Sequence, residues 1–356
     1  MTTVYNVIGI MSGTSLDGTD VAFCRFEYSE KKWQYHIIKA ATFKYPVSWK
    51  KRLSEAGSLT ALDFSFLHVE YGEYLGKIVK KIISKNKFIP DFICSHGHTI
   101  FHQPDKMLTV QIGNGAAIAS ATGYTTICDF RTTDVAFGGQ GAPLVPVGDE
   151  LLFGNFDICL NIGGFANLSY KNKTKRVAFD VCPANIILNH LAGKIGLDYD
   201  SGGRNARKGI ILEELLAQLN CLEFYKLKPP KSLGREWLES KFIPIVERYQ
   251  EHQVNDVLHT VTGHIATQIA NTVNQTKAKK VLVTGGGAFN TFLLELIRKK
   301  CNAEIVLPDK EIINYKEALI FAFLGVLRIR NENNCLKSVT GARKDNCGGA
   351  VYFPGN

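Results

Sequence analysis

The segment from Gly9 to Asp20 holds the residue types in this chain that are best suited to chemistry. It reads Gly-Ile-Met-Ser-Gly-Thr-Ser-Leu-Asp-Gly-Thr-Asp and joins two apolar stretches, residues 4–10 and 21–26, that we predict to be strands. Glycines let backbone N–H groups approach an anion, hydroxyls add donors, and carboxylates hold a cation. The segment therefore predicts a phosphate site, although Asp17-Gly18 alone also favours a plain hairpin turn. It is not a Walker A loop, because no Gly-Lys-Ser/Thr follows.

Two further glycine-rich segments follow predicted strands. Residues 285–290, Gly-Gly-Gly-Ala-Phe-Asn, lie between a predicted strand at 280–284 and a predicted helix from about 290 to 300. Three glycines leave the backbone bare beside a helix N-terminus, which suits ligand contact, whereas a tight turn needs only one or two. Gly163-Gly164 follows Asn161 in a predicted hairpin. A glycine pair suits any hairpin turn, but beside the first segment it predicts contact with outer phosphates.

Asp180 stands at the end of the predicted strand 177–181, ahead of a predicted helix at 186–192. A carboxylate in that position serves as a general base if it lies within hydrogen-bond reach of its proton. It also suits the N-cap of the following helix. Position alone does not separate the two roles.

Three histidines, His96, His98 and His102, lie close to Cys94. No second ligand group follows at a spacing typical of zinc, so polar contacts to a substrate are the favoured interpretation. Arg131 offers a bidentate clamp for a substrate carboxylate, and a surface ion pair is its alternative role.

Composition limits the classes of function. The chain has 356 residues, 45% hydrophobic and 21% charged, with a net charge of +9. The basic residues are scattered rather than interleaved with aromatics, so no nucleic-acid footprint is present. Nine cysteines without a Cys-x-x-Cys pair indicate reduced thiols. Without a signal peptide or an apolar stretch of ~20 residues, we expect a soluble, cytoplasmic protein with no membrane partner.

The order of predicted elements is repeated. A hairpin, a third strand, a helix and a further strand occupy the first half, with the helix at 61–86 and the strand at 91–95. The same order begins again near residue 156, with the helix at 256–276. That helix carries apolar residues at a four-residue spacing, which predicts one buried face. We therefore expect a duplicated α/β chain: a first lobe at 1–130 joined by 326–356, and a second lobe at 131–325. Residues 200–207 are expected to be a surface loop.

Taken together, these motifs resemble the anhydro-N-acetylmuramic acid kinase family, within the sugar-kinase and actin-like ATPase superfamily. The most specific of them are Met-Ser-Gly-Thr-Ser-Leu-Asp-Gly at 11–18 and Gly-Gly-Gln-Gly-Ala-Pro-Leu-Val-Pro at 138–146. Matching segments lie at 9–20, 95–104, 111–114, 129–146, 161–168, 179–185, 285–290, 317–325 and 338–342. The resemblance implies a duplicated actin-like, ribonuclease H-like two-lobed kinase fold with a central cleft, and a homodimer.

The resemblance also implies the reaction and its residues. ATP would phosphorylate O6 of 1,6-anhydro-N-acetylmuramic acid while water opens the anhydro bridge, giving the 6-phosphate in cell-wall recycling. Asp180 would be the base, and Asp17 and Asp20 would act on Mg²⁺ through water. Sugar contacts would come from His96, Thr99, Arg131 and Glu317. The ATP contacts would be Gly13, Thr14, Ser15, Leu16, Asp17, Gly18, Thr19, Asp20, Asn161, Gly163, Gly164, Gly285, Gly286, Gly287 and Asn290.

One segment departs from the family pattern. The family commonly has Gly-Phe-Asp-Thr-Gly-Pro-Gly-Asn around its base, whereas residues 178–185 here read Ala-Phe-Asp-Val-Cys-Pro-Ala-Asn. His98 stands where a Gln is often found, which suggests pH sensitivity near neutrality. Two alternatives therefore stay open: a kinase for another amino sugar, and a nucleotide-dependent sugar-binding protein with impaired catalysis.

Overall fold

The computed structural model describes residues 2–13 and 16–355, which divide into two compact units. Unit 1 is the chain up to Leu152 together with the chain from Tyr315 onward, and unit 2 is Phe153–Asn314. The sequence placed these divisions near 130 and 325. Unit 1 includes a buried ion pair between α5 (Val145–Leu151) and α12 (Lys310–Ile329), Asp149 to Lys316 at 2.7 Å.

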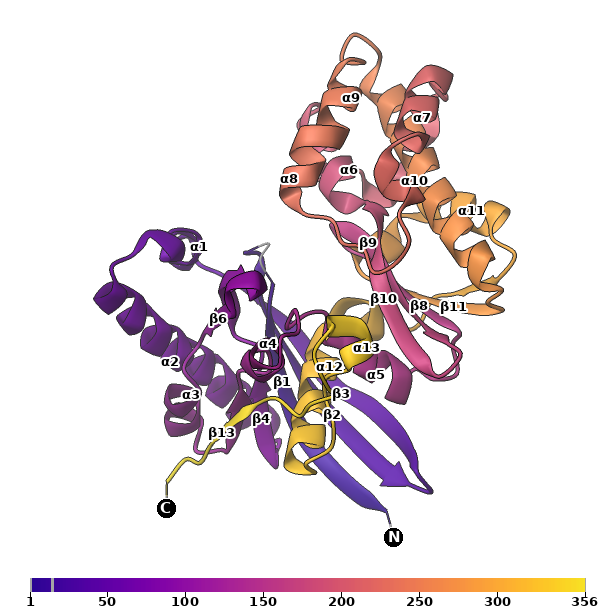
Figure 1. The fold of residues 1–356 in the computed structure, drawn as a ribbon. Coiled ribbons are helices and arrows are strands. Elements are labelled where there is room, and N and C mark those ends of the chain that lie inside the picture. Colours follow the sequence, from indigo (N-terminus) through magenta and orange to yellow (C-terminus); the bar gives the residue numbers. More distant parts are fainter. Residues whose placement is uncertain (1, 14–15, 356) are drawn as a thin grey trace. The chain divides into compact units, whose positions relative to one another are not determined.

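The main sheet of unit 1 has the strand order β13-β7-β4-β1-β2-β3 (Figure 1). Its first three strands form an antiparallel meander, and β4 and β7 continue it in parallel from β1. The strands are β1 (Thr3–Ser12), β2 (Gly18–Ser29), β3 (Lys32–Lys44), β4 (Phe92–Ser95), β7 (Thr126–Cys128) and β13 (Ala350–Tyr352). The C-terminal β13 pairs antiparallel with β7, which brings the end of the chain onto the first unit.

Helices cover this sheet because alternate strand residues are apolar. Ile8 and Ile10 of β1 share a buried core with Leu67 and Tyr71 of α2. The thiol of Cys94 in β4 lies 3.6 Å from the Ala322 carbonyl of α12. A small antiparallel hairpin, β5 (His98–Gln103) and β6 (Leu108–Ile112), follows β4. The remaining helices are α1 (Val47–Ser54), α2 (Ala61–Asn86), α3 (Gly115–Thr122), α4 (Thr132–Ala136) and α13 (Lys337–Thr340).

The sheet of unit 2 has the order β10-β9-β8-β11-β12. Its strands are β8 (Ile158–Ile162), β9 (Phe165–Asn172), β10 (Lys175–Pro183), β11 (Lys280–Thr284) and β12 (Glu304–Val306). Again the first three form an antiparallel meander, and the fourth and fifth run parallel to the first. Both units thus share one strand order, so the duplicated α/β fold predicted from the sequence is confirmed.

The long helix α10 (Val254–Thr276) supplies much of the core of unit 2. The apolar face predicted from the four-residue spacing is buried as expected, from Val257 through Ile265 to Val273. The other helices of unit 2 are α6 (Asn185–Gly193), α7 (Glu213–Asn220), α8 (Arg235–Trp237), α9 (Ile243–Glu247) and α11 (Thr291–Lys300). Within the described residues, every helix is too short or too polar to cross a lipid bilayer.

Candidate active site

The turn between β1 and β2 carries the first group of predicted ligand residues. Thr14 and Ser15 lie outside the described residues, and Gly13 and Leu16 flank them in half-buried positions. Asp17 is exposed, and the Asp20 carboxylate accepts a hydrogen bond from the Thr42 hydroxyl at 2.5 Å. Burial raises the pKa of Asp20, the Thr42 bond opposes this rise, and the charge of Asp17 adds to it. A half-buried carboxylate beside a second negative charge makes a suitable place for a cation.

A buried cluster of hydroxyls supports this turn from within unit 1. The Ser12 and Tyr71 hydroxyls are 2.6 Å apart, and the Thr19 and Tyr45 hydroxyls are 2.8 Å apart. Tyr45 and Tyr71 are joined as well, at 2.6 Å. The hydroxyl of Thr19, predicted to contact ATP, is therefore turned into the unit and already has partners. Its backbone lies in β2, where Thr19 pairs with Ser12 of β1 and Phe43 of β3.

In unit 2, two predicted glycine segments lie together. Thr284 of β11 pairs with Asn161 of β8, so the carboxyl ends of these parallel strands meet at one edge of the sheet. A Cβ placed on Gly285 would lie 2.5 Å from the Asn161 carboxamide oxygen and 2.8 Å from the Ile162 carbonyl oxygen. Gly285 also has φ of +82°. The residues Asn161, Gly163, Gly164, Gly285, Gly286 and Gly287 are called the glycine edge below.

The glycine edge contains two kinds of glycine. Gly285 and Gly287 are packed against Ile162, so the fold of unit 2 itself excludes a side chain there. A Cβ on Gly286 would meet only the Asn185 carboxamide, at 3.5 Å, and a Cβ on Gly164 only Ile186, at 3.7 Å. These are ordinary van der Waals contacts. Packing inside unit 2 therefore explains part of the triple glycine and leaves Gly286 unexplained.

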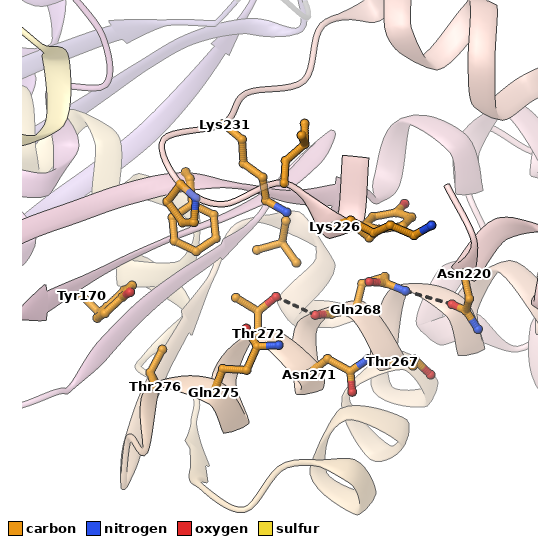
Figure 2. A pocket seen from close by; sticks show the side chains of 15 residues that line it. Tyr170, Asn220, Lys226, Lys231, Thr267, Gln268, Asn271, Thr272, Gln275 and Thr276 are labelled. Atoms are coloured by element: carbon orange, nitrogen blue, oxygen red, sulfur yellow. Dashed lines mark hydrogen bonds between the residues drawn. The ribbon is translucent and has the colours of Figure 1, made fainter. Parts of the chain in front are cut away.

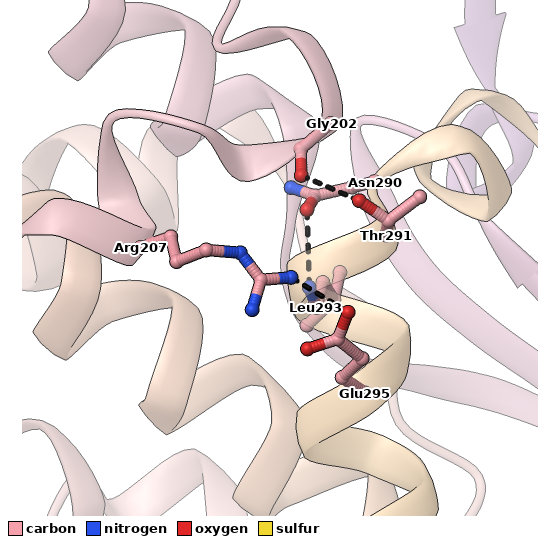
Figure 3. A network of polar contacts seen from close by, with 6 residues as sticks. All are labelled: Gly202, Arg207, Asn290, Thr291, Leu293 and Glu295. Atoms are coloured by element: carbon pink, nitrogen blue, oxygen red, sulfur yellow. Dashed lines mark hydrogen bonds and ion pairs between the residues drawn. The ribbon is translucent and has the colours of Figure 1, made fainter.

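Asn290, predicted to contact ATP, is the N-cap of α11. Its carboxamide oxygen accepts the Leu293 N–H at 3.0 Å, and the neighbouring Thr291 hydroxyl donates to the Gly202 carbonyl at 2.9 Å (Figure 3). Residues 200–207, expected as a surface loop, instead form two short 3₁₀ turns packed at this helix end. Asp200 is buried and accepts the Ala206 N–H at 2.9 Å, which corrects that expectation.

Asp180 lies inside β10, which continues to Pro183 and so runs past the predicted strand end at 181, and the strand pairing shifts between Asp180 and Cys182. One oxygen of its carboxylate accepts the Leu233 N–H at 2.8 Å, and its own N–H donates to the Lys231 carbonyl at 3.0 Å. The N-cap role that was its alternative is not seen, because residue 184 precedes α6 without a side-chain cap. Burial raises the pKa of Asp180 and the Leu233 bond opposes this rise. A half-buried carboxylate with a raised pKa is a stronger base.

The residues after Asp180, which depart from the family pattern, face inward. Val181, Cys182 and Ala184 belong to the hydrophobic core of unit 2. Ala184 and Asn185 donate their N–H groups to the carbonyls of Gly164 and Gly163, at 2.8 and 3.1 Å. The residues of the departure therefore pack inside the core, and the backbone joins β10 to the glycine edge.

In unit 1, His96 and Arg131 form one fixed group. Arg131 donates to the His96 Nε2 from its Nε at 3.0 Å, and to the Gly141 carbonyl from an Nη at 2.7 Å. The His96 Nδ1 then donates to the Gly97 carbonyl at 2.9 Å. This pattern requires a neutral imidazole. Burial, followed by the charge of Arg131, lowers the pKa of His96 well below 6.5.

The other predicted sugar contacts lie nearby in unit 1. The charges of Glu317 and Arg131 act on each other's pKa. Thr99 pairs with Gln111 in the β5–β6 hairpin. Within the part of the chain that the structure describes, the buried His98 Nδ1 and Gln111 Oε1 have no hydrogen-bond partner. Buried polar atoms normally have one, so this hairpin suits a polar ligand. Burial lowers the pKa of His98, which moves its charge change to more acidic pH than the sequence suggested.

Two positioning groups were missed in the sequence. The buried Asp134 carboxylate accepts the Gly141 N–H at 2.8 Å, the Thr340 hydroxyl at 2.9 Å and the Asn346 amide at 2.8 Å. It thereby fixes the loop whose carbonyl holds Arg131. The second group is Leu233, which holds Asp180. Both act across long sequence separations, and no local motif marks them.

Comparison with known proteins identifies relatives over nearly the whole chain. The family model described as anhydro-N-acetylmuramic acid kinase matches residues 5–354. A protein of that name from Francisella tularensis subsp. novicida (strain U112) is 35% identical, covering 97% of this chain and 98% of the relative. Another from Bacillus thuringiensis subsp. konkukian (strain 97-27) is 34% identical, covering 98% and 99%. A solved structure of the activator of the 2-hydroxyisocaproyl-CoA dehydratase from Clostridium difficile aligns with a TM-score of 0.43 at 12% identity, covering 93% and 97%.

Proposed function

Because the chain belongs to the anhydro-N-acetylmuramic acid kinase family, we propose that it opens 1,6-anhydro-N-acetylmuramic acid with water and phosphorylates its O6 with ATP. The product is N-acetylmuramic acid 6-phosphate, and the physiological setting is the recycling of cell-wall sugar in the cytoplasm. The observation that carries the proposal is the Asp180 carboxylate. It lies in β10 at the shift in strand pairing, with one oxygen accepting the Leu233 N–H, in the same unit as the glycine edge.

The proposed chemistry balances in one sequence of bond changes. Asp180 takes a proton from water, and the water oxygen forms a bond to C1 of the sugar. The C1–O6 bond breaks, and O6 attacks the γ-phosphorus as the bond to the β,γ-bridging oxygen breaks and ADP leaves. The raised pKa of Asp180 supports the first step, because a carboxylate that is less stable when charged takes the proton more readily.

Substrate recognition is assigned to unit 1. Arg131 already uses N–H groups on His96 and Gly141, which fix its guanidinium plane, and its remaining N–H groups are proposed to bind the lactyl carboxylate. Thr99 and Glu317 are proposed to bind sugar hydroxyls. Neutral His96 supports this assignment, since it leaves Arg131 as the cation of the pair.

ATP recognition is assigned to the β1–β2 turn, the glycine edge and the region of Asn290. Packing within unit 2 does not explain why residue 286 is a glycine. Gly286 therefore supports contact between bare backbone and the nucleotide. The paired carboxylates Asp17 and Asp20 fit Mg²⁺, which when bound neutralises phosphate charge during transfer. We also carry the homodimer as part of the proposal, to be tested by light scattering.

The experiment follows ADP release and the phosphorylated sugar together, with 1,6-anhydro-N-acetylmuramic acid as substrate. Asp180→Asn is expected to lower turnover by about 10²- to 10⁴-fold, the usual contribution of a general base. Asp198→Asn, an exposed residue of the same unit, is the matched control and keeps full activity. In water labelled with ¹⁸O, the label should enter the anomeric hydroxyl and not the phosphate. Full turnover by Asp180→Asn, or label in the phosphate, contradicts the proposal.

A further inference from the structure

Unit 2 contains a cavity of about 540 Å³ that the proposed reaction does not use (Figure 2). It lies between α10 and the β9–β10 hairpin, and the segment after the 3₁₀ turn Glu223–Lys226 forms another wall. A cavity of this size accommodates a small metabolite. Every lining residue belongs to unit 2: Tyr170, Phe179, Val181, Asn220, Tyr225, Lys226, Leu227, Pro229, Lys231, Thr267, Gln268, Asn271, Thr272, Gln275 and Thr276.

The charge of the lining favours an anion. It contains Lys226 and Lys231 and no Asp or Glu. The Lys231 ammonium donates to the Phe224 carbonyl at 3.1 Å and lies 4.5 Å from the centre of the Phe224 ring. Neither lysine forms an ion pair among the described residues. A half-buried ammonium without a carboxylate partner attracts an anionic ligand group.

The remaining lining suits a hydroxylated ligand. Thr267, Asn271 and Gln275 recur at a four-residue spacing on α10, and Gln268 and Thr272 form a parallel row. A helix that packs on a sheet normally turns apolar residues toward it. The apolar face of α10 does so, and polar side chains from another face of the helix line the cavity together with the rings of Tyr170 and Phe179. Carboxamides, hydroxyls and aromatic faces together fit the polar edges and apolar faces of a sugar ring.

A buried network fixes part of this wall. Tyr225 donates to the His264 Nε2 at 2.9 Å, and the His264 Nδ1 donates to the Asn220 oxygen at 2.7 Å. Gln268 donates to the same oxygen at 2.9 Å, as Figure 2 shows. Both nitrogens of the His264 ring thus have a partner. The network holds the lining side chains of Tyr225, Asn220 and Gln268 in fixed positions. The cavity is therefore a preorganised site.

The wall that carries Lys231 also holds Asp180. The Lys231 carbonyl accepts the Asp180 N–H at 3.0 Å, and the Leu233 N–H binds the Asp180 carboxylate at 2.8 Å. A ligand that orders Lys231 therefore acts on the same three-residue segment that positions Asp180. We propose that this cavity binds a small phosphorylated sugar, and that the bound molecule adjusts the position of Asp180 through residues 231–233. The second part rests on the proposed function.

The test measures binding of N-acetylglucosamine 6-phosphate to the full chain by calorimetry, without ATP. Asn271→Asp/Gln275→Glu adds two negative charges to the exposed part of the lining with little change in shape. It is expected to weaken binding by about tenfold or more, equivalent to about 1.4 kcal/mol. Asn189→Asp/Gln250→Glu makes the same charge change at exposed positions outside the cavity and should leave binding unchanged.

Two further measurements separate this cavity from the proposed sugar site. Arg131→Ala should leave calorimetric binding of the probe intact, whereas the cavity variant should not. Hydrogen exchange of peptides covering residues 227–234 should slow when the probe binds the unaltered chain. The kinase turnover of the unaltered chain should change at the same probe concentration. Absence of binding, binding lost only in Arg131→Ala, or binding that leaves exchange and turnover unchanged would overturn the proposal. A chain that lacks kinase activity would still give readable binding and exchange results.

Discussion

The two kinds of glycine at the glycine edge lead to a prediction in which stability and nucleotide binding move separately. Gly286 is not among the residues with positive φ, and a Cβ there meets only the Asn185 amide nitrogen at 3.5 Å. Gly286→Ala is therefore expected to keep or raise the free energy of unfolding, by about 0.4–1 kcal/mol, because it restricts the unfolded chain without straining the folded one. Its methyl group would nevertheless occupy the space assigned to the nucleotide.

Gly285→Ala is the matched comparison one residue away. Its φ of +82° and the Asn161 oxygen 2.5 Å from the added Cβ make the substitution strained and crowded. We expect a loss of about 1–3 kcal/mol in the free energy of unfolding. Loss of nucleotide binding in this variant would be uninformative by itself, because the distorted turn would affect binding indirectly.

The assay combines urea unfolding with calorimetric binding of a non-hydrolysable ATP analogue. Gly286→Ala should unfold at the same or higher urea concentration and bind the analogue at least about tenfold more weakly, a change of about 1.4 kcal/mol. If Gly286→Ala instead destabilises as much as Gly285→Ala, the packing argument is refuted. If it binds the analogue as tightly as the unaltered chain, Gly286 is not a nucleotide contact.

Three further predictions concern buried polar groups. Asp180→Asn is expected to unfold at a higher temperature at pH 7 while losing turnover. The pKa of Asp180 is raised, so its charged form lowers the stability of the fold as pH rises through that pKa. A lower melting temperature would contradict this. His264, with its pKa lowered by burial to about 3, stays neutral in the fold while the unfolded chain takes up a proton below about pH 6.5. Stability should therefore fall by about 1.4 kcal/mol per pH unit from pH 6.5 downward, and His264→Gln should flatten that slope in urea unfolding at several pH values. Asp134→Ala leaves the Gly141, Thr340 and Asn346 donors without their acceptor, and should cost about 3 kcal/mol or more in urea unfolding; the exposed Asp105→Ala should cost little.

Much of the fold could be predicted because its signals are local. The helix predicted at 61–86 is α2 at Ala61–Asn86, where Thr60 caps the first turn by accepting the Asp63 N–H. The strand predicted at 280–284 is β11. Alternation and turn residues define such elements within a few positions of chain. The bounds of unit 1 differ from the predicted division, and they enclose the Asp149–Lys316 ion pair, which joins distant parts of the sequence.

The site shows the same contrast between local and distant information. The glycine segments and Asp180 stand out in the sequence as residue types, yet the partner that orients Asp180 lies 53 positions away in a segment without regular structure. The pKa of His96 is likewise lowered by burial and then by the charge of Arg131, 35 positions away. A charge or tautomer is set by the whole shell of neighbours, so residue type and spacing alone predict the candidates but not their protonation.

The common strand order explains why the candidate residues recur at equivalent places in the two units. In each unit the first strand enters a glycine-containing hairpin turn, at β1–β2 and at β8–β9, and the fourth strand ends beside it, at His96 after β4 and at Gly285 after β11. The carboxyl ends of parallel strands in open α/β sheets are where ligands bind. The supporting structure differs: buried hydroxyls lie beneath the β1–β2 turn, whereas close-packed backbone supports the glycine edge. Removing the Tyr71 hydroxyl should therefore disturb the β1–β2 turn and not the glycine edge. Gly285→Ala should disturb the glycine edge and not the β1–β2 turn.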